Sequence, residues 1–106
     1  MSPLIGLNDA MGRATAGLAR SDTSFAVMLA AGQTKTITVP GGARVMLLNA
    51  TGDVWVRFGA AAAVPAADVL DGSAPELNPV ARDVAGLSII GLAAPAACTV
   101  NLVFYQ

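Results

Sequence analysis

From Phe25 onward, the sequence is a series of short apolar runs that alternate with period two and are separated by turns containing Gly or Pro. The last run is the clearest, because its apolar residues at every second position would share one face of a strand: Cys98, Val100, Leu102 and Phe104. Short strands at spacings of about 8–12 residues are typical of an antiparallel sandwich or barrel. The pattern therefore predicts an all-β fold, with strands at 25–29, 34–39, 44–49, 54–58, 80–84, 87–92 and 98–105.

Two connections in this series resemble hairpin turns. Residues 50–53 are short and polar and lie between the alternating runs 44–49 and 54–58, which predicts a β-hairpin. Pro40-Gly41-Gly42 is interpreted as a second hairpin turn and not as a phosphate-binding loop. Residues 60–79 form a long irregular segment in which Pro65 ends any helical turn. A segment of about twenty residues in a compact domain is usually functional or contains short strands of its own.

Residues 1–24 differ in pattern from the rest of the chain, because three glycines interrupt their apolar residues. Their apolar residues follow a helical spacing after a Ser2-Pro3 cap. Each glycine inside a helix costs about 1 kcal/mol relative to alanine. We therefore expect an extended N-terminal arm at 1–24 that becomes ordered on a neighbouring subunit, with a helix as the alternative. The candidate contact residues of the arm are Leu4, Ile5, Met11 and Leu18.

A chain of 106 residues is long enough for one domain. We assign 25–106 to a small antiparallel β-sandwich whose strand order could follow a jelly roll. Residues 84–106 carry no charge and are long enough to span a bilayer. Gly, Pro and polar residues interrupt this stretch and its second half alternates, which predicts two buried strands and no membrane span. The first residues lack a cationic segment and a long apolar core, so no secretory signal is predicted.

The sequence lacks the residues that most catalytic and metal sites need. It contains no histidine and one cysteine, Cys98, which excludes imidazole-based triads, Cys/His zinc clusters and an intrachain disulfide. The strand pattern predicts an inert, buried thiol for Cys98. Asp68, Asp71 and Glu76 could form a weak calcium site or a hydrolytic carboxylate pair, although turn formation explains the aspartates and a domain of this size offers little cleft. No catalytic, cofactor-binding or metal-binding residue is predicted.

The surface is expected to be poor in charge. Charged residues make up 12% of the chain, about half the usual share of about 25%. They are spread over about 5,500 Å² of surface for a folded monomer of this mass, which indicates faces covered by neighbouring subunits. The formal net charge of −1, without a basic cluster, argues against nucleic-acid binding. Trp55, Arg57 and Tyr105 are candidate contact residues, and roles in the core or in glycan binding remain open for the aromatic ones.

Three segments carry a resemblance to a known family: residues 40–44 (PGGAR), residues 49–59 (NATGDVWVRFG) and, after an Ala/Pro-rich loop, residues 87–91 (LSIIG). Over 25–106 the sequence resembles small virion proteins of tailed bacteriophages, the β-sandwich head-decoration or cement proteins. The resemblance implies a virion structural protein without enzymatic activity or cofactor. It also implies binding to the major capsid protein and to copies of itself, in three-fold clusters. A head–tail connector, or a tail or fibre-associated sandwich module that binds glycans, is the alternative.

Overall fold

The structure is a computed structural model that describes residues 1–8 and 14–106. All regular elements in this part of the chain are strands: β1 (Gly6–Asn8), β2 (Ala14–Leu18), β3 (Ser24–Leu29), β4 (Thr34–Thr38), β5 (Val45–Ala50), β6 (Trp55–Phe58), β7 (Glu76–Leu77), β8 (Ala81–Asp83), β9 (Ile89–Ala93) and β10 (Cys98–Tyr105). Each run predicted as a strand contains one, and the irregular segment 60–79 contributes the short strand β7. The all-β class is therefore confirmed.

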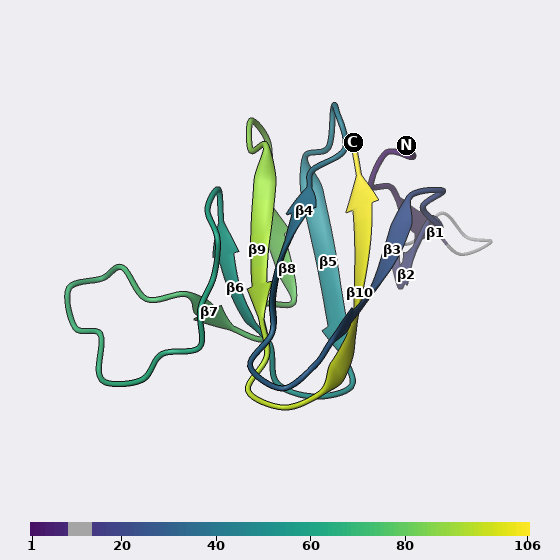
Figure 1. The fold of residues 1–106 in the computed structure, drawn as a ribbon. Helices are drawn as coiled ribbons and strands as arrows, with labels where there is room; N and C mark the ends of the chain where they lie inside the picture. Colours follow the sequence, from purple (N-terminus) through teal and green to yellow (C-terminus); the bar gives the residue numbers. More distant parts are fainter. Residues whose placement is uncertain (9–13) are drawn as a thin grey trace.

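Strands β3 to β10 form two antiparallel sheets that face each other (Figure 1). Sheet I has the order β3-β10-β5-β8, and sheet II has the order β4-β9-β6-β7. The pairs β3–β10, β4–β9, β5–β8 and β6–β7 are nested, as in one long hairpin that has been rolled up. The further pairs β5–β10 and β6–β9 complete the two sheets. This is the strand order of a jelly roll. The predicted sandwich is therefore confirmed, and its strands are connected as in a jelly roll.

The predicted hairpin between 44–49 and 54–58 is wrong. Both runs are strands, but β5 pairs with β10 and β8 in sheet I, whereas β6 pairs with β9 and β7 in sheet II. Residues 51–54 therefore cross from one sheet to the other. Met46 and Leu48 of β5 and Val56 of β6 are all buried. Placing the two strands in opposite sheets lets these apolar faces meet across the core.

The turn at Pro40-Gly41-Gly42 is confirmed, but it does not form a hairpin. The N–H of Ala43 donates to the carbonyl of Pro40 over 3.1 Å, and Gly42 has a φ of 84°, which glycine adopts without strain. The turn joins β4 of sheet II to β5 of sheet I. After β3, only the β6–β7 connection begins and ends in the same sheet, and this connection is the loop at 59–75.

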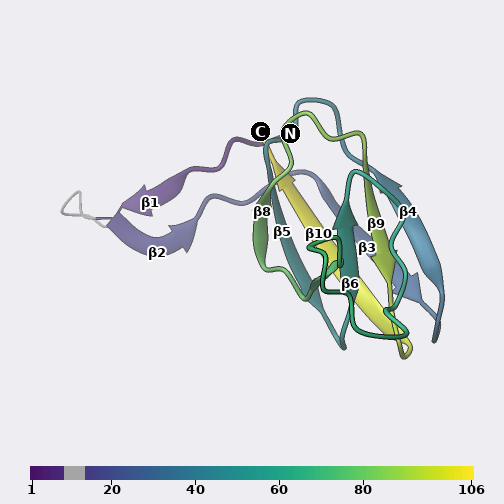
Figure 2. The ribbon, with the colours of Figure 1, turned by 90° about the vertical axis from the view of Figure 1, so that its left-hand side faces the viewer.

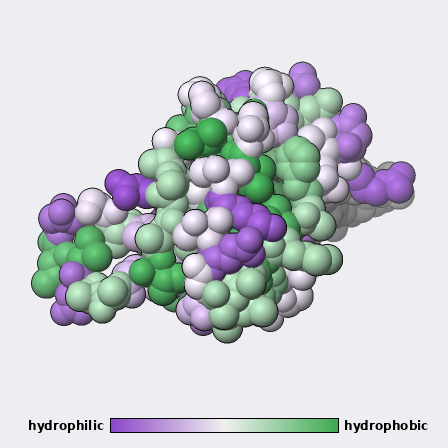
Figure 3. All heavy atoms as spheres, in the orientation of Figure 1, coloured by the Kyte–Doolittle hydropathy of each residue, from purple (hydrophilic) through white to green (hydrophobic). Residues whose placement is uncertain are grey.

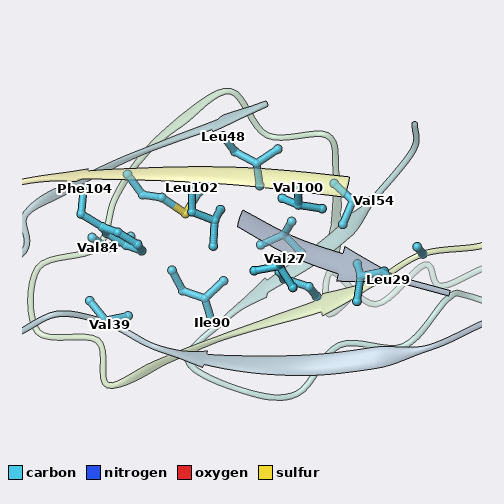
Figure 4. Close-up of a cluster of buried hydrophobic side chains, with 14 of the residues drawn as sticks. Val27, Leu29, Val39, Leu48, Val54, Val84, Ile90, Val100, Leu102 and Phe104 are labelled. Atoms are coloured by element: carbon cyan, nitrogen blue, oxygen red, sulfur yellow. The ribbon is translucent and has the colours of Figure 1, made fainter. Parts of the chain in front are cut away.

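The core lies between the sheets and is built from apolar side chains of both (Figure 4). The largest side chains that are fully buried include Phe104, Met46, Ile90, Leu92 and Leu102. The buried face predicted for the last strand is confirmed by the alternation along β10. Residues 84–106 supply β9 and β10 to this core, so the expectation of two buried strands there is also confirmed. Within the described residues, the chain has no helix long and apolar enough to cross a membrane.

Two cationic side chains bridge the sheets at their edges. Lys35 on β4 donates from Nζ to the carbonyl of Met28 on β3 over 2.7 Å. Arg82 on β8 pairs through Nε with the carboxylate of Glu76 on β7 over 3.1 Å. These four are the edge strands of the two sheets, and charged side chains at such edges hinder the addition of a further strand. The bridges therefore tie the sheets together and protect their edges.

The residues before β3 form an extended arm that leaves the sandwich (Figure 2). Within the arm, β1 pairs with β2 in antiparallel orientation, and the N–H of Ala19 donates to the carbonyl of Ile5 over 2.8 Å. No helix occurs in the described part of the arm, so the helical alternative is wrong there. The molecule measures 52 × 27 × 26 Å and exposes 6327 Å². This is about 800 Å² more than its mass predicts, because the arm and the 59–75 loop project from the sandwich.

Candidate interaction surfaces

Strand β6 places Trp55 and Arg57 on the outer face of sheet II. Val56 between them is buried in the core, so period-two alternation turns its two neighbours outward. Trp55 is half-buried and lies opposite Leu77 on β7 and Ala93 on β9, whereas Arg57 is exposed. One aromatic ring flanked by apolar side chains, with an arginine beside it, is typical of a protein contact. Sequence reasoning missed Leu77, because β7 lies in a segment without alternation.

The residues at 59–75, here called the long loop, begin by crossing the outer face of sheet II above Gly91 on β9. A Cβ atom on Gly91 would lie 2.4 Å from the carbonyl oxygen of Ala60 and 2.4 Å from the nitrogen of Ala62. Ala62 is itself buried. The absence of a side chain at Gly91 therefore lets the loop backbone rest directly on the sheet. In the sequence, Gly91 is recognisable only as part of a strand pattern. Its contact with Ala60 and Ala62 depends on how the long loop folds back over the sheet.

Beyond this base, the long loop projects from the body and carries apolar side chains at its end. Residues 68–71, here called the loop tip, place Val69 and Leu70 between two exposed aspartates, with Leu70 90% exposed. Figure 3 shows the same arrangement as hydrophobic spheres flanked by hydrophilic ones on the projecting loop. A leucine this exposed loses the stabilisation of about 1.5–3 kcal/mol that its burial would provide. The tip is thus a candidate contact surface.

Hydrogen bonds give the tip a defined local shape. The Oγ and N–H of Ser73 donate to Oδ1 of Asp71 over 2.6 and 3.0 Å. These donors lower the pKa of Asp71 from its ordinary value of 3.8, and the charge of Arg57 acts in the same direction. Gly72 between them has a φ of 88°, as this turn requires. Asp71 therefore remains ionised in neutral solution and has a structural role within the loop.

Asn78 fixes the chain directly after β7, the strand by which it returns from the long loop to sheet II. Its Oδ1 accepts from the N–H of Val54 over 2.8 Å, and its own N–H donates to the carbonyl of Val54 over 2.9 Å. Its Nδ2 donates to Oδ1 of Asp53 over 2.9 Å. Asn78 also has a φ of 50°, a region that asparagine tolerates better than most residues. One side chain thus joins the end of β7 to the crossing at 51–54.

The arm presents Leu4 and Ile5 to solvent, 39% and 52% exposed. Both lie next to β1, where the arm leaves the body. Met11 lies outside the described residues. Leu18 ends β2, and only its backbone position is described. Of the arm residues predicted to make contacts, two are therefore placed at an exposed surface.

Tyr105 does not belong to an exposed surface. Its side chain is 5% exposed, and its hydroxyl donates to the carbonyl of Ala19 over 2.9 Å. Ser21 also donates from Oγ to the carbonyl of Phe104. Tyr105 faces away from the core, but the root of the arm covers it. Its role in this structure is to hold the arm to sheet I.

Three of the groups considered for catalysis, Cys98, Glu76 and Asp71, have structural partners within the chain. Cys98 is buried, and its Sγ lies 3.7 Å from the carbonyl oxygen of Asp53. Glu76 pairs with Arg82, and Asp71 is occupied by its hydrogen bonds from the loop. No group of three or more acidic or thiol side chains that could hold a metal occurs in the described ranges. Five surface depressions, with volumes of about 240 to 620 Å³, are open to solvent.

Comparisons with known protein families, curated sequences and solved structures give no match for this chain.

Proposed function

We propose that this protein is a non-enzymatic structural subunit of a bacteriophage virion, a decoration or cement protein that binds the major capsid protein and copies of itself. The observation that supports the proposal best is a jelly roll from which two segments project with exposed apolar side chains. These segments are the arm, with Leu4 and Ile5, and the long loop, with Val69 and Leu70. They leave the body in different directions (Figures 1 and 2).

Such a shape suits a subunit that bridges its neighbours. Once one projecting segment has bound, the second binds at a high effective concentration, so several weak contacts give a tight attachment. Jelly rolls occur in viral capsid domains and also in lectins. The fold alone therefore does not decide the function, and the projecting apolar side chains carry the argument.

The anchoring of the arm explains how it can extend without loosening the sandwich. The N–H of Gln106 donates to the carbonyl of Ser2 over 2.9 Å, and the N–H of Phe104 donates to the carbonyl of Thr23 over 3.0 Å. Together with Tyr105, these contacts hold both ends of the hairpin at its root. The part beyond the root is free to lie across an adjacent subunit. Limited proteolysis tests this, and equal protection of the arm in free and assembled protein would count against it.

The copy number in purified particles tests the function. A decoration protein is present in hundreds of copies per virion, whereas a head–tail connector forms a single ring of copies. Quantitative mass spectrometry of phage particles that encode this chain measures the ratio to the major capsid protein. We expect hundreds of copies of this chain per particle, which is the copy number of a shell component. We also expect Leu70→Ser to lower the amount of this chain that is bound to particles. A ratio that corresponds to one ring would replace the decoration role with the connector role.

A further inference from the structure

The loop tip combines an exposed apolar side chain with negative charge. The long loop contains Asp68 and Asp71 and neither lysine nor arginine. Leu70 lies between the two aspartates and is 90% exposed. A surface that receives this tip therefore needs a hollow with apolar walls and a positive charge at its rim.

One surface depression of the sandwich has these properties. It lies between the β4–β5 turn and the β8–β9 turn and has a volume of about 620 Å³. Half-buried Pro40 and Leu87 supply apolar walls, and the glycines at both turns leave the hollow open. Of the residues that line it, only Arg44 is charged. Arg44 is exposed, and within the described residues it forms no ion pair.

We propose that the loop tip of one copy inserts into this turn depression of a second copy, with Leu70 against Pro40 and Leu87 and with Asp68 opposite Arg44. Asp68 is the better partner of the two aspartates, because Asp71 already accepts hydrogen bonds from Ser73 and lies near Arg57. The inference rests on the proposed role as an assembly subunit and names the contact between its copies.

The pairing is between different molecules. Figure 1 shows the two turns at the upper end of the sandwich and the long loop projecting sideways from its lower part, so the tip points away from the depression of its own chain. The two surfaces differ, so the contact runs head to tail. Contacts of this kind produce closed rings or open chains of subunits.

The contact is small, because it involves one loop tip and one depression. Interfaces well below about 1,200 Å² of buried surface are usually weak. Free protein should therefore associate reversibly at high concentration. The same contact strengthens when a shell holds the copies next to each other, because its partner is then present at high effective concentration.

Sedimentation velocity over a range of protein concentrations tests the pairing. We expect the wild-type protein to form species larger than dimers as its concentration rises. Asp68→Arg and Arg44→Asp should each raise the dissociation constant at least about tenfold, because each places like charges opposite one another. The double variant restores opposite charges, so its dissociation constant should return to within about threefold of the wild-type value. Leu70→Ser should weaken association by about tenfold or more, because its burial is lost.

Arg20→Asp is the matched control, because it reverses an exposed positive charge outside both surfaces and should leave association unchanged. Equal thermal unfolding of all variants shows that the fold is intact. A monomeric wild-type protein at all concentrations, unaffected single variants, or a double variant no better than the singles would each overturn the inference. Particle binding by the same variants is measured separately, so failure of this pairing is distinguishable from failure of the proposed function.

Discussion

Gly91 offers the most direct test of how the long loop is held. In Gly91→Ala, the new Cβ would lie 2.4 Å from the carbonyl oxygen of Ala60 and from the nitrogen of Ala62. It would lie 2.8 Å from the carbonyl carbon of Ala61. An ordinary contact begins near 3.4 Å, so the loop base has to retreat by about 1 Å. Because backbone cannot rotate aside as a side chain does, the cost is in the upper part of the range of about 1–3 kcal/mol for overpacking. The loop would also lose its contact with the sheet at Ala62.

Urea and thermal unfolding measure this effect. We expect the midpoint of thermal unfolding to fall by about 10 °C, given about 4–8 °C per kcal/mol for a domain of about this size. Limited proteolysis should cut the long loop faster in the variant. Gly41→Ala is the matched control, because its Cβ would meet nothing within 4 Å and its φ is not positive. Unchanged stability and cleavage in Gly91→Ala would refute the idea that the loop rests on this glycine.

Three further changes have expected outcomes. Asn78→Ala should lower the free energy of unfolding by about 1–3 kcal/mol in urea titration, because the buried N–H of Val54 loses its Oδ1 acceptor; Asn78→Asp keeps that acceptor but places a second carboxylate beside Asp53, so equal destabilisation by both changes would contradict the role given to the bond with Val54. The pKa of Asp71 measured by NMR should lie below 3.8, and Ser73→Ala should raise it. Because folding lowers this pKa, the associated stabilisation of the fold is fully present above pH 3.8 and is lost as the pH falls through the pKa of the folded state. Tyr105→Phe should lower the free energy of unfolding by about 1 kcal/mol and speed amide hydrogen exchange at the root of the arm. Unchanged exchange would exclude the hydrogen bond to Ala19 as an anchor of the arm.

The candidate surfaces were only partly predictable. Trp55 and Arg57 followed from alternation along one strand, and they do share the outer face of sheet II. Tyr105 shared the predicted outer face of the last strand, but the arm covers it. Alternation along a strand shows which face of the sheet each side chain occupies. The segment that packs over that face can come from anywhere in the chain, so the sequence of the strand does not show it.

Leu77 and the loop tip were missed as contact residues because the segment 60–79 has no period that assigns a face. Their exposure depends on where the long loop is anchored, at Gly91 and Asn78. Neither anchor has a distinctive sequence signal. Glycine in a strand pattern and Asn-Pro after a loop both occur for many local reasons.

The sequence by itself determined where seven of the eight sandwich strands lie and which face of the last strand is apolar, because alternation and Gly or Pro turns act over a few residues. It did not show β7 or the two strands of the arm. It also determined that an arm with three glycines would not favour a helix. Only the tertiary structure decided that neighbouring strands belong to opposite sheets. The partners of β3 and β4 are β10 and β9, nearly the whole domain away, and they are selected by how all apolar faces close around one core.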